Sequence, residues 1–152
     1  MKHAITYIAG GSSKMKKHIE LAEAYREKGD WQRARRFYEE HLKHHPDDLY
    51  VRARHYQSVG MSENQLVGNG CSEFSSGPMT ADSWLALALF SMTAFRLNPG
   101  VCALVREARK SWENANQLEP QNSRVVRVGK EIEILEQVVK DLRAARAGSN
   151  VK

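Results

Sequence analysis

Two histidines, His41 and His45, lie four residues apart in the stretch "FYEEHLKHHP", a spacing that places helical side chains on one face. Imidazoles at this spacing can chelate zinc or copper. The same helical segment supplies no cysteine or carboxylate on that face, and His44 falls on a different one. We therefore interpret His41 as a packing residue, and we expect neither a metal nor a cofactor.

The cysteines are the next candidates for chemistry. Cys71 lies in the stretch "GNGCSEF" and Cys102 lies far from it. A reactive thiol needs a neighbouring base or cation, and none is evident beside Cys71. No phosphate-binding glycine loop, no Gly-x-Ser-x-Gly and no His-Glu-x-x-His motif is present. The sequence predicts a protein that is not an enzyme. Two cysteines are too few for a disulfide framework, which favours the cytoplasm.

Basic residues gather near the N-terminus, in a chain with a net charge of +5. Aromatic residues are interleaved with them, a combination that can bind nucleic acid. Acidic residues alternate with the basic ones, so ion pairs at helical spacing explain the cluster more simply. RNA binding is therefore the alternative hypothesis, with nucleic acid not expected as the main partner. The cluster comprises Lys14, Lys16, Lys17, Arg33, Arg35 and Arg36, with Trp31, Phe37 and Tyr38.

The elements that would position these residues are helices. Apolar residues recur at steps of three and four, and glycine, proline and capping residues divide the chain into about six segments. No strand-period segment follows the first ten residues, so the fold class predicted is all-α. The expected helices are 12–28, 31–44, 49–59, 80–97, a segment reaching 118, and 123–147.

The same punctuation predicts one domain over 12–147, preceded by an extended arm at 1–11 and followed by a frayed tail at 148–152. Within the domain, 58–80 is rich in glycine and serine and predicts an unusually long loop. The longest uncharged run, Ser83 to Phe95, has 13 residues. This length is too short to cross a bilayer, so we expect a buried helix there and no membrane span.

Residues 15–48 resemble a tetratricopeptide repeat, a helix–turn–helix unit of 34 residues. Small Ala22 and Ala34 stand where two helices would cross, Gly29 would form the turn, and Pro46 would end the second helix. The positions that carry the resemblance are Leu21, Ala22, Tyr25, Gly29, Asp30, Ala34, Tyr38, Leu42 and Pro46. The resemblance implies an array of antiparallel helices.

A divergent copy lies within 81–122, where "ARKSWENANQLEP" parallels "ARRFYEEHLKHHP". Its turn, "RLNPGVCA", is longer than the family norm and lacks the Gly-Asp pair. The helix at 123–147 has a regular apolar face, which is typical of the helix that closes such an array. The same regularity leaves open a homodimer formed through this helix.

The resemblance implies that the protein binds a peptide or helix of a partner in a concave groove lined by the first helices of its units. We therefore predict a non-catalytic adaptor, scaffold or chaperone-like module, whose basic residues favour an acidic partner. Ile19 and Glu23 occupy the slots of the family's carboxylate clamp, so no clamp is expected. A self-associating structural scaffold is a further alternative. The predicted partner-binding residues are Lys16, Glu20, Glu23, Arg26, Glu27, Arg52 and Tyr56.

Overall fold

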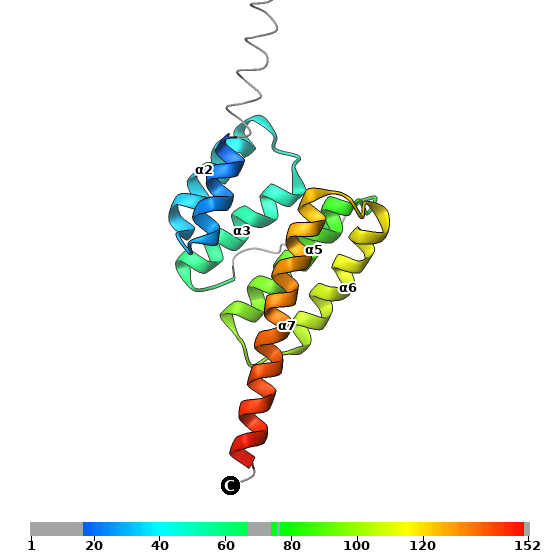
Figure 1. Cartoon of the computed structure of the whole chain (residues 1–152). Helices are drawn as coiled ribbons and strands as arrows, with labels where there is room; N and C mark the ends of the chain where they lie inside the picture. The colour runs from blue at the N-terminus through cyan, green and yellow to red at the C-terminus, as the bar shows by residue number, and fades with distance from the viewer. Residues whose placement is uncertain (1–16, 67–73, 76, 151–152) are drawn as a thin grey trace, which may run out of the picture. The chain divides into compact units, whose positions relative to one another are not determined.

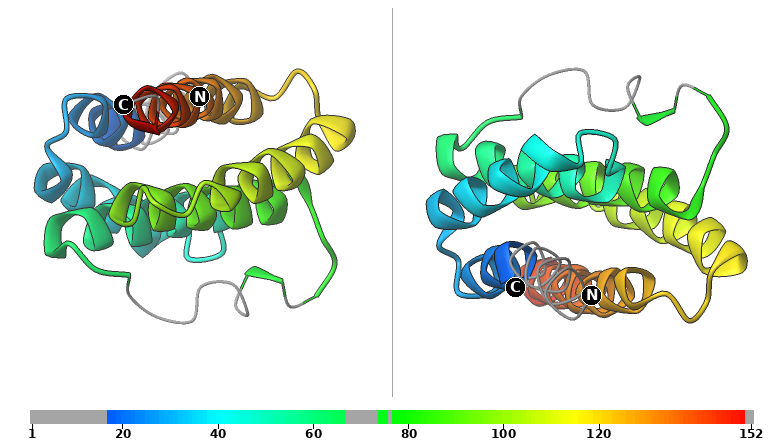
Figure 2. Two further views of the ribbon diagram at one scale, coloured as in Figure 1. Left: turned by 90° about the horizontal axis from the view of Figure 1, so that it is seen from below. Right: turned by 90° about the horizontal axis from the view of Figure 1, so that it is seen from above.

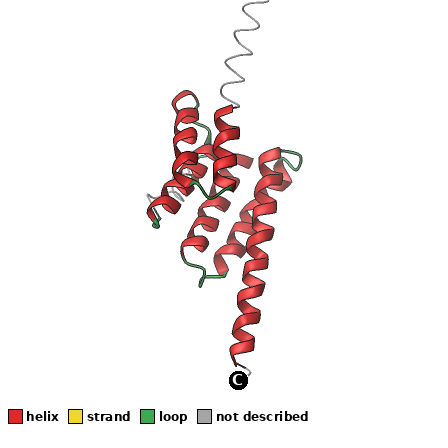
Figure 3. Ribbon diagram, turned by 60° about the vertical axis from the view of Figure 1, so that its left-hand side comes forward, coloured by secondary structure: helices red, strands yellow, loops and turns green. Residues whose placement is uncertain are grey.

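A computed structural model describes residues 17–66, 74–75 and 77–150, and all regular elements in that part of the chain are helices (Figures 1 and 3). This confirms the all-α prediction of six helices. Contacts divide the chain into two compact units, Met1–Val67 and Gly68–Lys152. The first unit contains a helix over 17–27, α2 (Trp31–His44) and α3 (Leu49–Glu63). The second contains α5 (Ala81–Leu97), α6 (Ala103–Leu118) and α7 (Ser123–Asn150).

The turn between the helix over 17–27 and α2 is set by Gly29, whose φ of 81° is a left-handed conformation that glycine adopts without strain. The Gly29 amide donates to the Arg26 carbonyl at 2.9 Å, and the Asp30 amide donates to the Tyr25 carbonyl at 2.9 Å. These two bonds form a Schellman motif, which satisfies the last carbonyls of the first helix. Asp30 then caps α2 by accepting from the Arg33 amide at 3.3 Å.

The two small residues that we expected at the helix crossing, Ala22 and Ala34, are both 0% exposed. Beside them the rings of Tyr25 and Phe37 stack at 5.7 Å between centroids, 5° from parallel. The segment therefore folds as the antiparallel pair that the resemblance implied. A larger side chain at either alanine would separate the helices, because protein interiors are close-packed.

The third helix continues beyond the predicted boundary, so the long loop does not begin at residue 58. The hydroxyls of Ser58 and Ser62 donate to carbonyls four residues earlier, at 2.9 and 2.7 Å, and this bonding is compatible with a continuing helix. The helix ends at Glu63, and its C-cap Asn64 has a φ of 57°. Residues 67–73 and 76 of the remaining predicted loop, together with the predicted arm and Lys16, lie outside the described residues.

One turn recurs at the ends of α2, α5 and α6, where the sequences are "HPDD", "NPGV" and "EPQN". The residue before each proline leaves the helix, with φ of −135°, −143° and −143°. The fourth residue donates its amide to the carbonyl of the first at 3.2 Å in all three turns. Proline disfavours the helical conformation of the preceding residue, which explains the shared geometry. Asn98 is thus the C-cap of α5.

In the second unit, α6 and α7 run in opposite directions after a short turn (Figure 2). The apolar face of α7 is buried against its neighbours, as the capping role predicts, through Val125, Val128, Ile132, Leu135 and Val139. The apolar face of α7 that could form a homodimer is therefore already packed against helices of the same unit. Its end differs from the prediction, because α7 continues through Asn150 rather than fraying from residue 148. In the described part of the chain, no helix is both long and apolar enough to cross a bilayer.

Asp48 caps α3, and its substitution tests how far this turn stabilises the first unit. One carboxylate oxygen accepts from the Val51 amide at 3.3 Å, and the other lies 2.9 Å from His41 Nε2. Asp48→Ala is expected to lower the free energy of unfolding by about 1–2 kcal/mol, because it removes both bonds. Urea titration followed by circular dichroism checks this value. Asp47→Ala, at an exposed neighbour, is the matched control and should have little effect.

Candidate functional site

The structure separates the predicted partner-binding residues into buried and accessible groups. Glu23 and Arg26, expected to face a ligand, are instead only 4% and 6% exposed. Glu20 and Glu27 are exposed on the helix over 17–27, and Arg52 and Tyr56 are half-buried on α3. Among the described members of the predicted set, these four side chains are the accessible ones.

Glu23 is the centre of a buried polar network that joins the helix over 17–27 to α3. Arg26 donates to the Glu23 carboxylate from both Nε, at 2.9 Å, and its terminal nitrogen. The Tyr50 hydroxyl donates to the other Glu23 oxygen at 2.9 Å, and accepts from Arg54 Nε at 3.0 Å. Arg54 is 0% exposed and also donates to Gln57 at 3.0 Å. The face assigned to a ligand thus carries residues that bond to one another.

The electrostatics of this network depend on the two arginines. Burial by itself would raise the pKa of Glu23, but attraction to Arg54 and Arg26, with hydrogen bonds from Arg26 and Tyr50, lowers that pKa below its ordinary value of 4.5. Burial also raises the pKa of Tyr50 and of Tyr38, so both hydroxyls stay protonated. The network therefore holds a carboxylate ionised inside the unit.

The lowered pKa of Glu23 predicts acid sensitivity. A carboxyl whose pKa is lower in the folded state contributes stability above its unfolded pKa, and this stability is lost as pH falls through the folded value. The free energy of unfolding of the first unit should therefore decrease as pH drops below about 4.5. Urea titrations at a series of pH values measure this slope. In Glu23→Gln the slope should be shallower, and an unchanged slope would assign the effect to other carboxylates.

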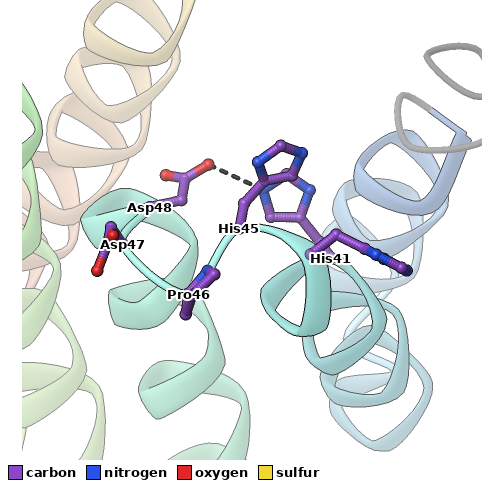
Figure 4. Close-up of a pocket in the computed structure, with 6 residues that line it drawn as sticks. His41, His45, Pro46, Asp47 and Asp48 are labelled. Atoms are coloured by element: carbon purple, nitrogen blue, oxygen red, sulfur yellow. Dashed lines mark hydrogen bonds and ion pairs between the residues drawn. The ribbon is translucent and has the colours of Figure 1, made fainter. Parts of the chain in front are cut away.

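A shallow pocket of about 400 Å³ lies where α2 meets α3 (Figure 4). Three histidines line it, His41, His44 and His45. The rings of His41 and His45 lie 4.9 Å apart, and His41 Nε2 is 2.9 Å from Asp48 Oδ2. His41 is buried, as its packing role predicted. Among the described residues, no group of three histidine, cysteine or acidic side chains is placed to hold a metal ion.

Two of the described members of the basic cluster, Arg33 and Arg35, form ion pairs on the helices. Arg33 lies 3.6 Å from Asp30, and Arg35 lies 3.2 Å from Glu39 and 3.7 Å from Glu63. Tyr38 is buried, so its ring is not available to stack on a base. This arrangement supports the ion-pair interpretation over a nucleic-acid surface.

Sequence reasoning missed the contribution of Arg54 and Tyr50 to the interior. A signal was present, since Arg54 falls between Tyr50 and Gln57 at helical spacing on a face that also carries apolar residues. A buried arginine on such a face requires a nearby negative charge. Glu23, on the helix over 17–27, supplies that charge. Sequence reasoning also missed a cleft between α6 and α7.

Residues 18–57 match the family model of the tetratricopeptide repeat, a segment that includes the helix pair and most of α3. No curated protein matches the chain, and no solved structure matches it. The resemblance seen at 15–48 is therefore confirmed for this segment. The divergent copy lies outside the match.

Proposed function

We propose that this chain is a non-catalytic adaptor, scaffold or chaperone-like module that binds a polypeptide segment of a partner protein. The observation that carries the proposal is the tetratricopeptide repeat at 18–57, since repeats of this family are in general protein-interaction modules. The sequence is consistent with a non-catalytic role, because it contains no phosphate-binding glycine loop, no Gly-x-Ser-x-Gly and no His-Glu-x-x-His motif. The small number of cysteines favours the cytoplasm as its location.

The surface proposed for the partner is the accessible part of the helix over 17–27 and α3. Glu20, Leu21, Ala24 and Glu27 are exposed at helical spacing, so they form one strip. Arg52 and Tyr56 form a second strip on α3. The buried network holds the helices that carry both strips in a fixed relation, which reduces the ordering cost of binding. These strips carry both negative and positive side chains. Binding of a partner and a preference for an acidic partner are therefore two separate predictions.

Site-specific crosslinking tests this proposal. A photoreactive phenylalanine derivative is placed at Glu20 or Tyr56, and the full chain is irradiated in lysate and analysed by mass spectrometry. We expect one polypeptide to be captured reproducibly at these positions. The matched control carries the same group at Arg36, which is exposed on α2, and should not capture that polypeptide.

RNA binding would give a different result in the same experiment. Phosphate contacts release counterions, so capture of RNA would weaken steeply as salt is raised, whereas a protein contact would weaken modestly. The proposal would be overturned if the group at Glu20 crosslinked nucleic acid. It would also be overturned if the group at Arg36 captured the same polypeptides equally well.

A further inference from the structure

A cleft of about 590 Å³ lies between α6 and α7, within the second unit. Its floor is apolar, because it includes Val105 of α6 and Val139 of α7, which are both buried. Its walls are charged, with five cationic side chains and two carboxylates. The cleft therefore combines an apolar base with a net charge of +3 from its lining residues.

Most of the positive charge in the cleft is not neutralised internally. Arg109 donates to both oxygens of Glu136, from its Nε at 3.0 Å and from a terminal nitrogen. Hydrogen bonding to Glu136 raises the pKa of Arg109 above its ordinary value. The other four cations are exposed and form no ion pair within the described residues. They are Arg106 and Lys110 of α6, with Lys140 and Arg143 of α7.

The geometry selects an acidic polypeptide over a nucleic acid. Glu113 and Glu136 lie among the cations that line the cleft, so they interrupt the continuous positive surface that a phosphate backbone would follow. The described residues that line the cleft include no aromatic ring on which a base could stack, and the Trp112 ring of α6 is covered by the Arg109 guanidinium at 4.9 Å from its centroid. An apolar floor suits one aliphatic side chain, and the surrounding cations suit carboxylates on either side of it.

We infer that the α6–α7 cleft binds an acidic segment of a partner protein, with one apolar side chain of that segment on Val105 and Val139 and its carboxylates on the surrounding cations. This site is separate from the proposed surface on the first unit, and it lies outside the segment that matches the repeat family. It would give the protein a second contact point. Its failure would leave the first proposal standing.

Peptide titration of the isotopically labelled full chain, followed by amide chemical shifts, tests the inference. The probe EEELEEE should shift amide resonances of the cleft residues on α6 and α7. Replacing its leucine by serine, in EEESEEE, should weaken binding about fivefold or more, because the apolar contact is lost. The neutral peptide QQQLQQQ should not bind measurably, because it lacks the carboxylates.

Lys140→Glu should weaken EEELEEE binding about threefold to tenfold, since it reverses one wall charge. Lys130→Glu, an exposed site on the same helix but outside the cleft, makes the same change in net charge and should leave binding unchanged. The inference is overturned if EEELEEE gives no shifts at the cleft or if EEESEEE binds equally well. Tighter binding of an oligouridylate at the same residues would also overturn it.

Discussion

Glu23→Ala is expected to destabilise the first unit by about 3–5 kcal/mol, because it removes the buried carboxylate from between two arginines. Arg26 and Tyr50 donate directly to that carboxylate, and Arg54 is attracted to it through space. Without it, Arg54 remains fully buried beside Arg26. A unit of this size has only about 5 kcal/mol of stability in total, so much of its helical structure should be lost. Hydrogen exchange resolved by residue measures this loss.

A neighbouring glutamate provides the control for this prediction. Glu27 is on the same helix and lies 3.9 Å from Arg26, but its side chain is 64% exposed. Glu27→Ala should therefore change the free energy of unfolding by no more than about 0.5 kcal/mol. The exchange rates of α5, α6 and α7 serve as an internal reference in both variants. If Glu23→Ala lowered the free energy of unfolding by less than about 1 kcal/mol, the polar network around Glu23 would not be what holds α3 in place.

Gly129→Val is expected to destabilise the second unit by about 3 kcal/mol, because there is no space for a side chain where α7 meets α6. A β-carbon at Gly129 would lie 2.8 Å from Cζ2 of Trp112 and 2.9 Å from its Cε2. The indole cannot move freely, since its Nε1 donates to the Val125 carbonyl at 2.7 Å and Arg109 covers its face. Hydrogen exchange resolved by residue over α6 and α7 reports the effect.

The same helix contains the matched control for Gly129. A β-carbon at Gly148 would meet nothing within 4 Å. Gly148→Val should therefore change stability by about 0.5 kcal/mol or less, since glycine and valine differ modestly in helix propensity. In a Trp112→Phe background, Gly129→Val should cost less than it does alone, because the smaller ring leaves space. Equal costs in both backgrounds would show that Trp112 is not the obstacle.

These two positions illustrate different limits of prediction from sequence. Gly129 lies within a helical pattern, where glycine by itself indicates only a local cost in helix propensity. Its role depends on Trp112, which is 17 residues away on another helix. Glu23 was predicted to meet a ligand because of its helical phase, but Tyr50 and Arg54 of α3 pack against it and, with Arg26 of its own helix, hold it inside the unit. In both cases the deciding contact is between elements, and helical phase describes a single element.

Local sequence signals account for the number of helices, for their turns and for the first antiparallel pair. Gly29, Asp30 and the prolines act on the backbone within a few residues, and Ala22 and Ala34 leave only one close crossing for neighbouring helices. Tertiary structure alone decided which polar residues are buried and where the α6–α7 cleft forms. A charged side chain can be solvated or paired at the same helical position, and only the helix packed against it determines which occurs.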